Sequence, residues 1–272
     1  MDYAHLFNPG DSAMRKTLIA LSVGAALATP ILASADEPAL SANVTLGTEY
    51  IYRGIAQTKG DPTLQGGFDY ALNNGLYIGA WGSNISWISD AGVYPGETYT
   101  ASSSLELDVY GGYKGSISGD LGYDVGILTY NYPGKHFGSF DPNTVEIYGA
   151  LSYKWLTAKY SVTTGSLFGW TKSDGVSKTS GSGYLDLSGS YDMGGGLSLG
   201  AHVGHQTVSG NSNASYSDYS VSVSKEIAKA GTIGLKVSGT DAKDNCSAGE
   251  AYCFAGYEAG KTAAVLTFSK SF

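Results

Sequence analysis

Acidic side chains recur at alternating positions along many hydrophobic stretches of this 272-residue chain. In the segment SLELDVY, for example, Glu106 and Asp108 alternate with Leu105, Leu107 and Val109. Because a β-strand sends successive side chains to opposite faces, such residues share one face. On that face we expect the acids Glu49, Asp69, Glu106, Asp108, Asp124, Glu146, Asp186, Asp192, Asp218 and Glu226, and the bases Arg53, Lys154, Lys159 and Lys236. A water-filled interior lined by this set would attract cations. A filled interior in which these charges satisfy one another is the alternative.

Catalytic chemistry finds little support in the residue patterns. The chain contains neither a Gly-x-Ser-x-Gly elbow nor a His-Glu-x-x-His motif. His202 and His205 are three residues apart, so on one strand they point to opposite faces and cannot form a metal pair. Serine is abundant, so a serine near a histidine is expected by chance. We predict no enzymatic activity and no cofactor, and a hydrolase is the weakest alternative.

The elements that would position the charged face are strands. Period-two alternation recurs along the chain, and nothing in it forms a long amphipathic helix. The alternation predicts about twelve strands, at 42–53, 62–72, 75–88, 103–114, 120–132, 143–154, 156–170, 183–193, 196–208, 217–227, 231–241 and 261–272. Both faces of 75–88 carry aromatic or aliphatic residues, so its orientation stays open.

Connections between these strands alternate without exception between short turns and long loops. This arrangement is typical of a transmembrane antiparallel up-and-down β-barrel with short periplasmic turns and long extracellular loops. A soluble β-sandwich has no reason to segregate loop lengths by end. Aromatic residues near strand ends suggest girdles at the two membrane interfaces, formed by Tyr50, Tyr52, Trp87, Tyr132, Trp155, Trp170 and Tyr191.

The N-terminal region indicates export. Residues 14–35 have two basic residues, an apolar stretch and a small-x-small cleavage signal at Ala33–Ala35, as a secretory signal peptide does. Residues 1–13 are interpreted as a mis-called extension, and 36–272 as one outer-membrane barrel domain. A retained amphipathic anchor is disfavoured by Pro30. The net charge of −8, without a basic run, argues against nucleic acid as a partner.

The last strand and the longest loop carry two further predictions. The chain ends on Phe272 at the close of an alternating run, and a terminal aromatic is what outer-membrane assembly machinery commonly recognises. Lys270 can extend its ammonium into the membrane interface. Cys246 and Cys253 are the two cysteines of an exported chain, so we expect a disulfide between them. A metal site is the rival interpretation, but the pair has no nearby histidine.

Three stretches carry a resemblance to a known family. The segments at 50–87, 105–115 and 122–134, with their Tyr-Arg-Gly, Gln-Gly-Gly-Phe-Asp-Tyr and Trp-Gly-Ser-Asn elements, resemble the TorF-type porins. These are proteobacterial outer-membrane proteins of unknown function, named for a Gly-Cys-Trp motif. The likeness runs from the signal peptide to the final SKSF, but Ala80 stands where the motif has cysteine. The resemblance implies a porin without an established substrate.

Together these observations predict a porin-like channel in a bacterial outer membrane. It would pass small hydrophilic solutes or ions by diffusion and prefer cations. Its partners would be outer-membrane lipid, the assembly machinery and the permeating solutes. We expect Arg53 to pair with acids on neighbouring strands and to shape the entrance. The alternative is a structural or adhesive barrel with a closed, charge-filled lumen.

Overall fold

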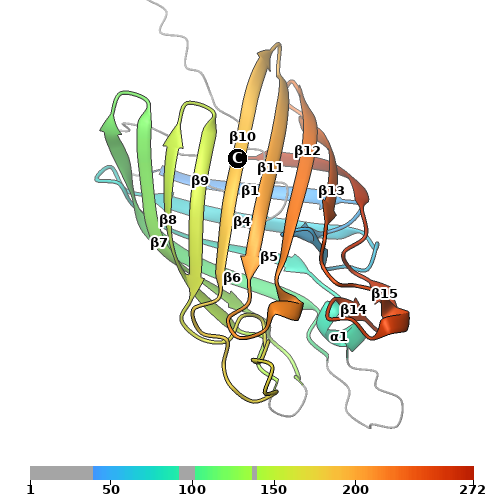
Figure 1. Ribbon diagram of the computed structural model, residues 1–272. Helices are drawn as coiled ribbons and strands as arrows, with labels where there is room; N and C mark the ends of the chain where they lie inside the picture. Colours follow the sequence, from blue (N-terminus) through green and yellow to red (C-terminus); the bar gives the residue numbers. More distant parts are fainter. Residues whose placement is uncertain (1–38, 92–101, 137–139) are drawn as a thin grey trace, which may run out of the picture.

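The computed structural model describes residues 39–91, 102–136 and 140–272, and in them twelve long strands close into one antiparallel barrel (Figure 1). Each strand pairs with its neighbours along the chain, and β16 pairs with β1 to close the sheet. The barrel strands are β1 (Ala39–Gly47), β4 (Thr63–Ala71), β5 (Leu76–Asn84), β6 (Leu105–Ser118), β7 (Leu121–Asn131), β8 (Thr144–Tyr153), β9 (Leu156–Thr163), β10 (Gly183–Gly194), β11 (Leu197–Thr207), β12 (Tyr216–Ile227), β13 (Gly231–Thr240) and β16 (Ala263–Ser271). The predicted fold class is therefore confirmed. The predicted signal peptide and extension lie outside the described residues.

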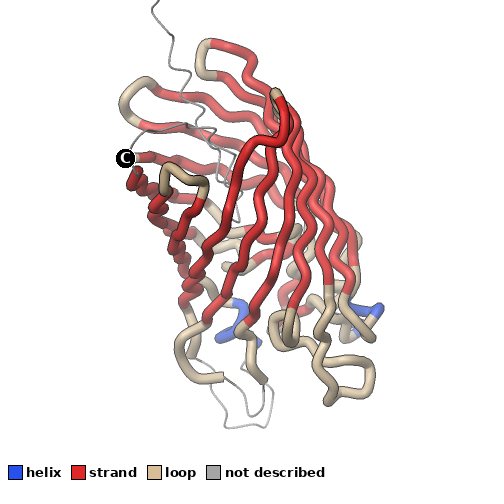
Figure 2. Tube along the Cα trace, turned by 90° about the vertical axis from the view of Figure 1, so that its left-hand side faces the viewer, coloured by secondary structure: helices blue, strands red, loops and turns tan. Residues whose placement is uncertain are grey.

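Short turns and long loops are segregated to opposite ends of the barrel. Turns such as 154–155 and 195–196 lie at one end, and the long loops lie at the other, which is the lower end in both views (Figures 1 and 2). The long loops contain the small elements β2 (Ile51–Tyr52), β3 (Ile55–Ala56), α1 (Trp87–Ala91), η1 (Ser212–Ala214), η2 (Cys246–Ala248), β14 (Cys253–Phe254) and β15 (Tyr257–Glu258). We call these the turn end and the loop end.

The outer surface of the barrel is apolar and its inner surface is polar. Leu46, Phe68 and Val221 point outward and are 56%, 57% and 60% exposed, and all twelve strands present such residues. Inside, buried polar and charged side chains line the strands, and two buried clusters of apolar and aromatic residues lie beside them. Closing the sheet satisfies every strand's backbone hydrogen bonds, which a sheet immersed in hydrocarbon requires. The apolar belt is therefore the surface that suits lipid.

Several predicted strands end earlier than the alternation suggested, and each does so at the loop end. The first strand stops at Gly47 instead of continuing to Arg53, and the third stops at Asn84, before α1. The third strand's open orientation is now settled, because Tyr77, Trp81 and Ser83 are buried inside while Ile78 is 57% exposed. The residues beyond these ends fold over or into the barrel.

The predicted aromatic girdles are wrong for the loop end. Tyr50, Tyr52 and Tyr132 are buried in one cluster inside the barrel, because the chain turns inward after Gly47. Trp87 and Trp170 also lie among the folded loops, where they line a cavity. At the turn end, Trp155 and Tyr191 are exposed on the outer surface with ring centroids 5.9 Å apart, as a girdle requires.

At its C-terminus the chain continues the pairing that closes the barrel. The backbone N–H of Phe272 donates to the carbonyl of Ala42 at 2.9 Å, and Ala42 donates back at 3.2 Å. The Phe272 ring is 71% exposed, with the Lys270 ammonium 5.5 Å from its centroid. In the part of the chain that is described, no helix has the length and hydropathy needed to cross a membrane.

Candidate functional site: a hairpin inside the barrel

The connection from β1 to β4 turns into the barrel as a short hairpin. Its two strands pair Ile51 with Ala56 and Tyr52 with Ile55, and the turn consists of Arg53 and Gly54. Both turn residues have positive φ, 47° and 76°, as a two-residue type I′ turn requires. A side chain on Gly54 would lie 2.6 Å from Cβ of Asp218 on β12, so the hairpin tip is packed against that strand. We call residues 48–62 the inner hairpin.

Arg53 at the hairpin tip crosses the lumen to a carboxylate. Its two terminal nitrogens donate to the two oxygens of Glu146 on β8 at 2.9 and 2.8 Å, and Nη1 also donates to Oε1 of Gln206 on β11 at 2.9 Å. The guanidinium lies 4.1 Å from the ring centroid of Tyr184 and 4.8 Å from that of Tyr52. Burial lowers the pKa of Arg53, but the ion pair with Glu146 outweighs burial and keeps the pKa well above the ordinary value of arginine. The predicted carboxylate partner exists, but not on a strand next to β1.

The inner hairpin fills the loop-end half of the barrel. Tyr50 and Ile51 are 1% and 4% exposed, and Tyr52 is 7% exposed. Every barrel strand contributes at least one buried inward side chain at this level: Thr45, Gln65, Ser83, Glu106, Tyr130, Glu146, Ser161, Asp186, Gln206, Asp218, Ser238 and Val265. The lumen is therefore narrowed around its whole circumference, and Arg53 lies within this constriction.

Glu106 and Asp108 stand two residues apart on the inward face of β6, as predicted, and both are buried. Tyr50 donates to Oε1 of Glu106 at 3.4 Å. The other oxygen of Glu106 and Oδ1 of Asp108 are buried without a hydrogen-bond partner in the described part of the chain. Neither carboxylate has an ion pair with Arg53 or Lys114 among the described residues.

A histidine that the sequence did not single out as a lumen residue lies between two acids. The His202 ring, on β11, is 3.1 Å from Oδ2 of Asp186 through Nδ1 and 2.8 Å from Oδ1 of Asp218 through Nε2. Tyr184 donates to the second oxygen of Asp218 at 2.9 Å. His205 is exposed outside and contacts Ser217, so the two histidines do face opposite sides. The sequence does carry a signal for this position. His202 and Gln206 are four residues apart on one strand, so they face the same side of it.

A second polar layer lies toward the turn end, where the inward tyrosines are buried and the acids and lysine beside them are half-buried. Tyr77 donates to Asp124 at 2.7 Å and also contacts the hydroxyl of Tyr148. Tyr110 donates to Asp69 at 2.6 Å. The ammonium of Lys159 is 4.0 Å from the ring centroid of Tyr148. These acids and this lysine therefore interact inside the barrel.

The remaining predicted lumen residues divide into inner and outer positions. Glu49 accepts from the backbone of Gly60 at 2.9 Å, and burial raises its pKa, while Nζ of Lys236 lies 3.5 Å from the carbonyl of Ile51. Asp192 and Glu226 are exposed near the turn end. The prediction for Lys154 is wrong. It lies in the β8–β9 turn with φ 55°, exposed, and its ammonium lies over the outward Tyr153 ring.

A cavity of about 710 Å³ lies among the long loops and meets the inner hairpin at Tyr52, Ile55 and Gln57. Its other walls come from four further loops and from barrel residues next to them. Nine of its twenty described lining residues are aromatic: Tyr52, Trp87, Tyr132, Phe140, Phe168, Trp170, Tyr216, Tyr252 and Phe254. The cavity adjoins the constriction at Gln206, which accepts a hydrogen bond from Arg53.

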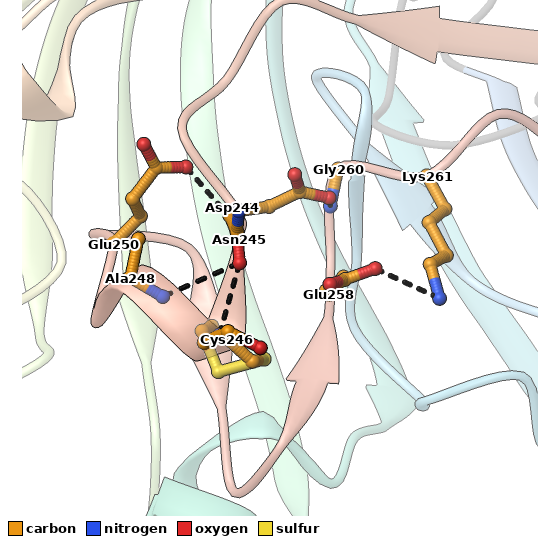
Figure 3. Close-up of a disulfide and its surroundings, with 10 residues drawn as sticks. Asp244, Asn245, Cys246, Ala248, Glu250, Glu258, Gly260 and Lys261 are labelled. Carbon is orange, nitrogen blue, oxygen red and sulfur yellow. Dashed lines mark hydrogen bonds and ion pairs between the residues drawn. A yellow bond between two sulfur atoms is a disulfide. The ribbon is translucent and has the colours of Figure 1, made fainter.

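The predicted disulfide is confirmed in the β13–β16 loop (Figure 3). Cys246 and Cys253 are bonded, with Cα atoms 5.0 Å apart. Asn245 begins the adjoining turn by accepting from Ser247 and Ala248, and Asp244 accepts from Gly260 at 3.1 Å. This loop forms one wall of the cavity through residues 249–256. In the described ranges no group of three or more His, Cys, Asp or Glu side chains is arranged to hold a metal ion.

One solved porin structure supports the fold. The KdgM porin superposes with a TM-score of 0.50 at 8% identity, covering 85% of this chain and 98% of that one. The NanC porin gives 0.48 at 10% identity over 85% and 98%, and an outer-membrane channel from Pseudomonas putida F1 gives 0.45 at 13% over 88% and 97%. No curated protein matches the sequence. A family model described as "Bacterial protein of unknown function (Gcw_chp)" matches residues 33–272. The chain therefore belongs to the Gcw_chp family.

Proposed function

We propose that this protein is a porin-like channel of the bacterial outer membrane, of the TorF type, whose conductance is limited by the inner hairpin. The observation that carries the proposal is a closed barrel with an apolar outside and a charged inside. Its apolar belt suits a membrane, and its interior offers polar groups from end to end. The solved structure of a KdgM porin with disordered oligogalacturonate supports the idea that this fold admits solutes, but gives no substrate for this chain.

The charges at the constriction support a preference for cations. Five buried acids lie there: Glu106, Asp108, Glu146, Asp186 and Asp218. Arg53 and His202 pair with three of them, and the charges of Lys159 and Lys236 act on Glu146, Asp186 and Asp218. Glu146 is neutralised by Arg53, whereas Glu106 and Asp108 each keep an unpartnered oxygen. An ionised carboxylate buried without a partner is costly, so these two acids are the groups whose charge a passing cation would compensate. A passing cation gains most from this pair.

Reversal potentials in a planar bilayer under a KCl gradient test this preference. The wild-type protein should select K⁺ over Cl⁻, and Glu106→Gln combined with Asp108→Asn should lower that selectivity. Glu226→Gln is the matched control, because this acid is exposed near the turn end and should leave selectivity unchanged. Anion selectivity at neutral pH, or equal effects of the two variants, would refute the assignment.

A structural or adhesive barrel is the second candidate, and the filled constriction favours it. Inward side chains of all twelve described barrel strands are buried at the loop end. A barrel of this kind would show no conductance in a bilayer, with or without the inner hairpin. We propose no catalytic role, since the His202 cluster has no nucleophile placed with it among the contacts that the structure describes.

A further inference from the structure

We propose that the aromatic cavity at the loop end is a binding site for an uncharged, ring-bearing and largely apolar solute. The cavity measures about 710 Å³. Sites for drug-sized molecules typically measure about 300–1,000 Å³ and are lined by apolar and aromatic side chains with few polar groups. This site adjoins the charged constriction, with which it shares Gln206, but it does not depend on the cation preference.

The aromatic walls hold one another in fixed orientations. Trp87 meets Tyr132 edge-on, with centroids 5.5 Å apart and an interplanar angle of 84°, and it lies 6.1 Å from Phe254. Across the cavity Trp170 meets Tyr252 at 5.5 Å. Edge-to-face pairs of this kind are favourable and give the rings defined positions. A flat solute therefore meets preset ring surfaces.

The charge and the hydrogen bonds of the lining residues limit which ligands the cavity can bind. Glu250 is the only charged residue among the described residues that line the cavity, and its Oε2 already accepts from the backbone of Asn245 at 2.8 Å. No basic side chain is among the described lining residues to neutralise an anion. Gln206 is engaged by Arg53 and by the carbonyl of Gly183, and the Tyr252 hydroxyl donates to the carbonyl of Ala214. These polar groups are committed, whereas Nε1 of Trp87 is a buried donor without a partner among the described residues, which suits an apolar solute with a single acceptor.

The ordered β13–β16 loop supports binding at the cavity wall that residues 249–256 form. The segment 249–252 lies between the two disulfide-bonded cysteines, and β14 pairs with β15 directly after it. A wall that is already ordered costs less conformational entropy when a ligand binds. The opposite wall includes Tyr52 and Gln57 of the inner hairpin, so an occupant would contact the element that narrows the lumen.

Calorimetric titration of the full chain in lipid nanodiscs tests the proposal with 2-naphthol as the probe. Heats from empty nanodiscs are subtracted to remove partition into lipid. We expect saturable binding at one site, and affinity at least about tenfold weaker for naphthalene-2-sulfonate, which carries the same rings and a negative charge. Non-saturable partition, or equal affinity for the anion, would overturn the proposal.

Matched variants then locate the site. Phe254→Ala removes a lining ring and should weaken naphthol binding at least about fivefold, whereas Phe68→Ala removes a ring from the outer surface and should leave it unchanged. Trp170→Leu is the second lining variant, in case Phe254→Ala does not fold. Unchanged binding in a folded lining variant would refute the site. Binding in nanodiscs does not require conduction, so this result and the channel test fail independently.

Discussion

Arg53 and Glu146 are 93 residues apart in the chain, yet they share two hydrogen bonds of 2.9 and 2.8 Å across the lumen. Their side chains are 7% and 2% exposed. One partner belongs to the inner hairpin and the other to the barrel wall. The pair therefore fastens the hairpin in place, and it is bidentate, which a lysine could not reproduce.

Truncating either partner should destabilise the folded protein, because it leaves the charge of the other partner buried and unpaired. We expect Arg53→Ala to lower the free energy of unfolding by about 3–5 kcal/mol, and Glu146→Ala by a similar amount. The double variant should lose much less than the sum. Urea titrations of the protein in lipid measure all three losses.

The exposed pair of Lys261 and Glu258 is the control for this cycle. Its side chains are 62% and 33% exposed at a distance of 2.9 Å, so its coupling should be about 0.2–1 kcal/mol. If the two pairs have equal couplings, the hairpin is not fastened by Arg53.

Gly54→Ala should lower the free energy of unfolding by more than the strain of a left-handed alanine alone would. Gly54 has φ 76°, and a Cβ there would lie 2.6 Å from Cβ of Asp218. Gly175 has φ 74° with open space around it, so Gly175→Ala measures the conformational strain by itself, roughly 1–2 kcal/mol. Gly54→Ala should exceed that loss in the same urea titration. Equal losses would mean that the hairpin tip does not press against β12.

The disulfide should stiffen one loop without supporting the barrel. In Cys246→Ser combined with Cys253→Ser, we expect trypsin to cleave faster after Lys243 or Lys261, which flank the loop on either side of the bonded cysteines. The barrel's unfolding midpoint should hardly change, since the twelve-stranded sheet does not include this loop. Unchanged cleavage would show that the loop is ordered without its cross-link.

Phe272→Ser separates assembly from stability. The Phe272 ring is 71% exposed, while its backbone pairs with Ala42, so the substitution removes little packing. We propose that the ring serves as the assembly signal. The variant should then refold in vitro with a normal free energy of unfolding, but reach the outer membrane in reduced amount when expressed in cells. Normal amounts in the outer-membrane fraction would contradict this role.

Period-two alternation was enough to predict most of the barrel from the sequence. The strand expected at 183–193 is β10, Gly183–Gly194, and the last two strands were also located closely. Outward residues such as Val221 had to be apolar and inward residues such as Asp218 polar, so the sequence carries the register of each strand. The disulfide was predicted because two cysteines lie in one loop of a chain that we expect to be exported.

The inner hairpin could not be predicted in the same way. Alternation continues from Val44 through Arg53, so nothing in the pattern signals that the strand ends at Gly47. The turn depends on a left-handed conformation at Arg53, which is uncommon outside glycine. Tyr-Arg-Gly, the element that carried the family resemblance, contains this turn. Its position inside the barrel depends on partners far away in sequence, which periodicity does not report.

Single-channel recording of a variant without the inner hairpin tests the central claim most directly. Gly47 and Thr63 are register partners on adjacent strands, so a four-residue turn can replace residues 48–62 without moving the barrel. If the hairpin limits conduction, this variant should show open steps several-fold larger than those of the wild type in the same KCl solution. A folded variant whose steps match the wild type, or that conducts nothing, would contradict the account.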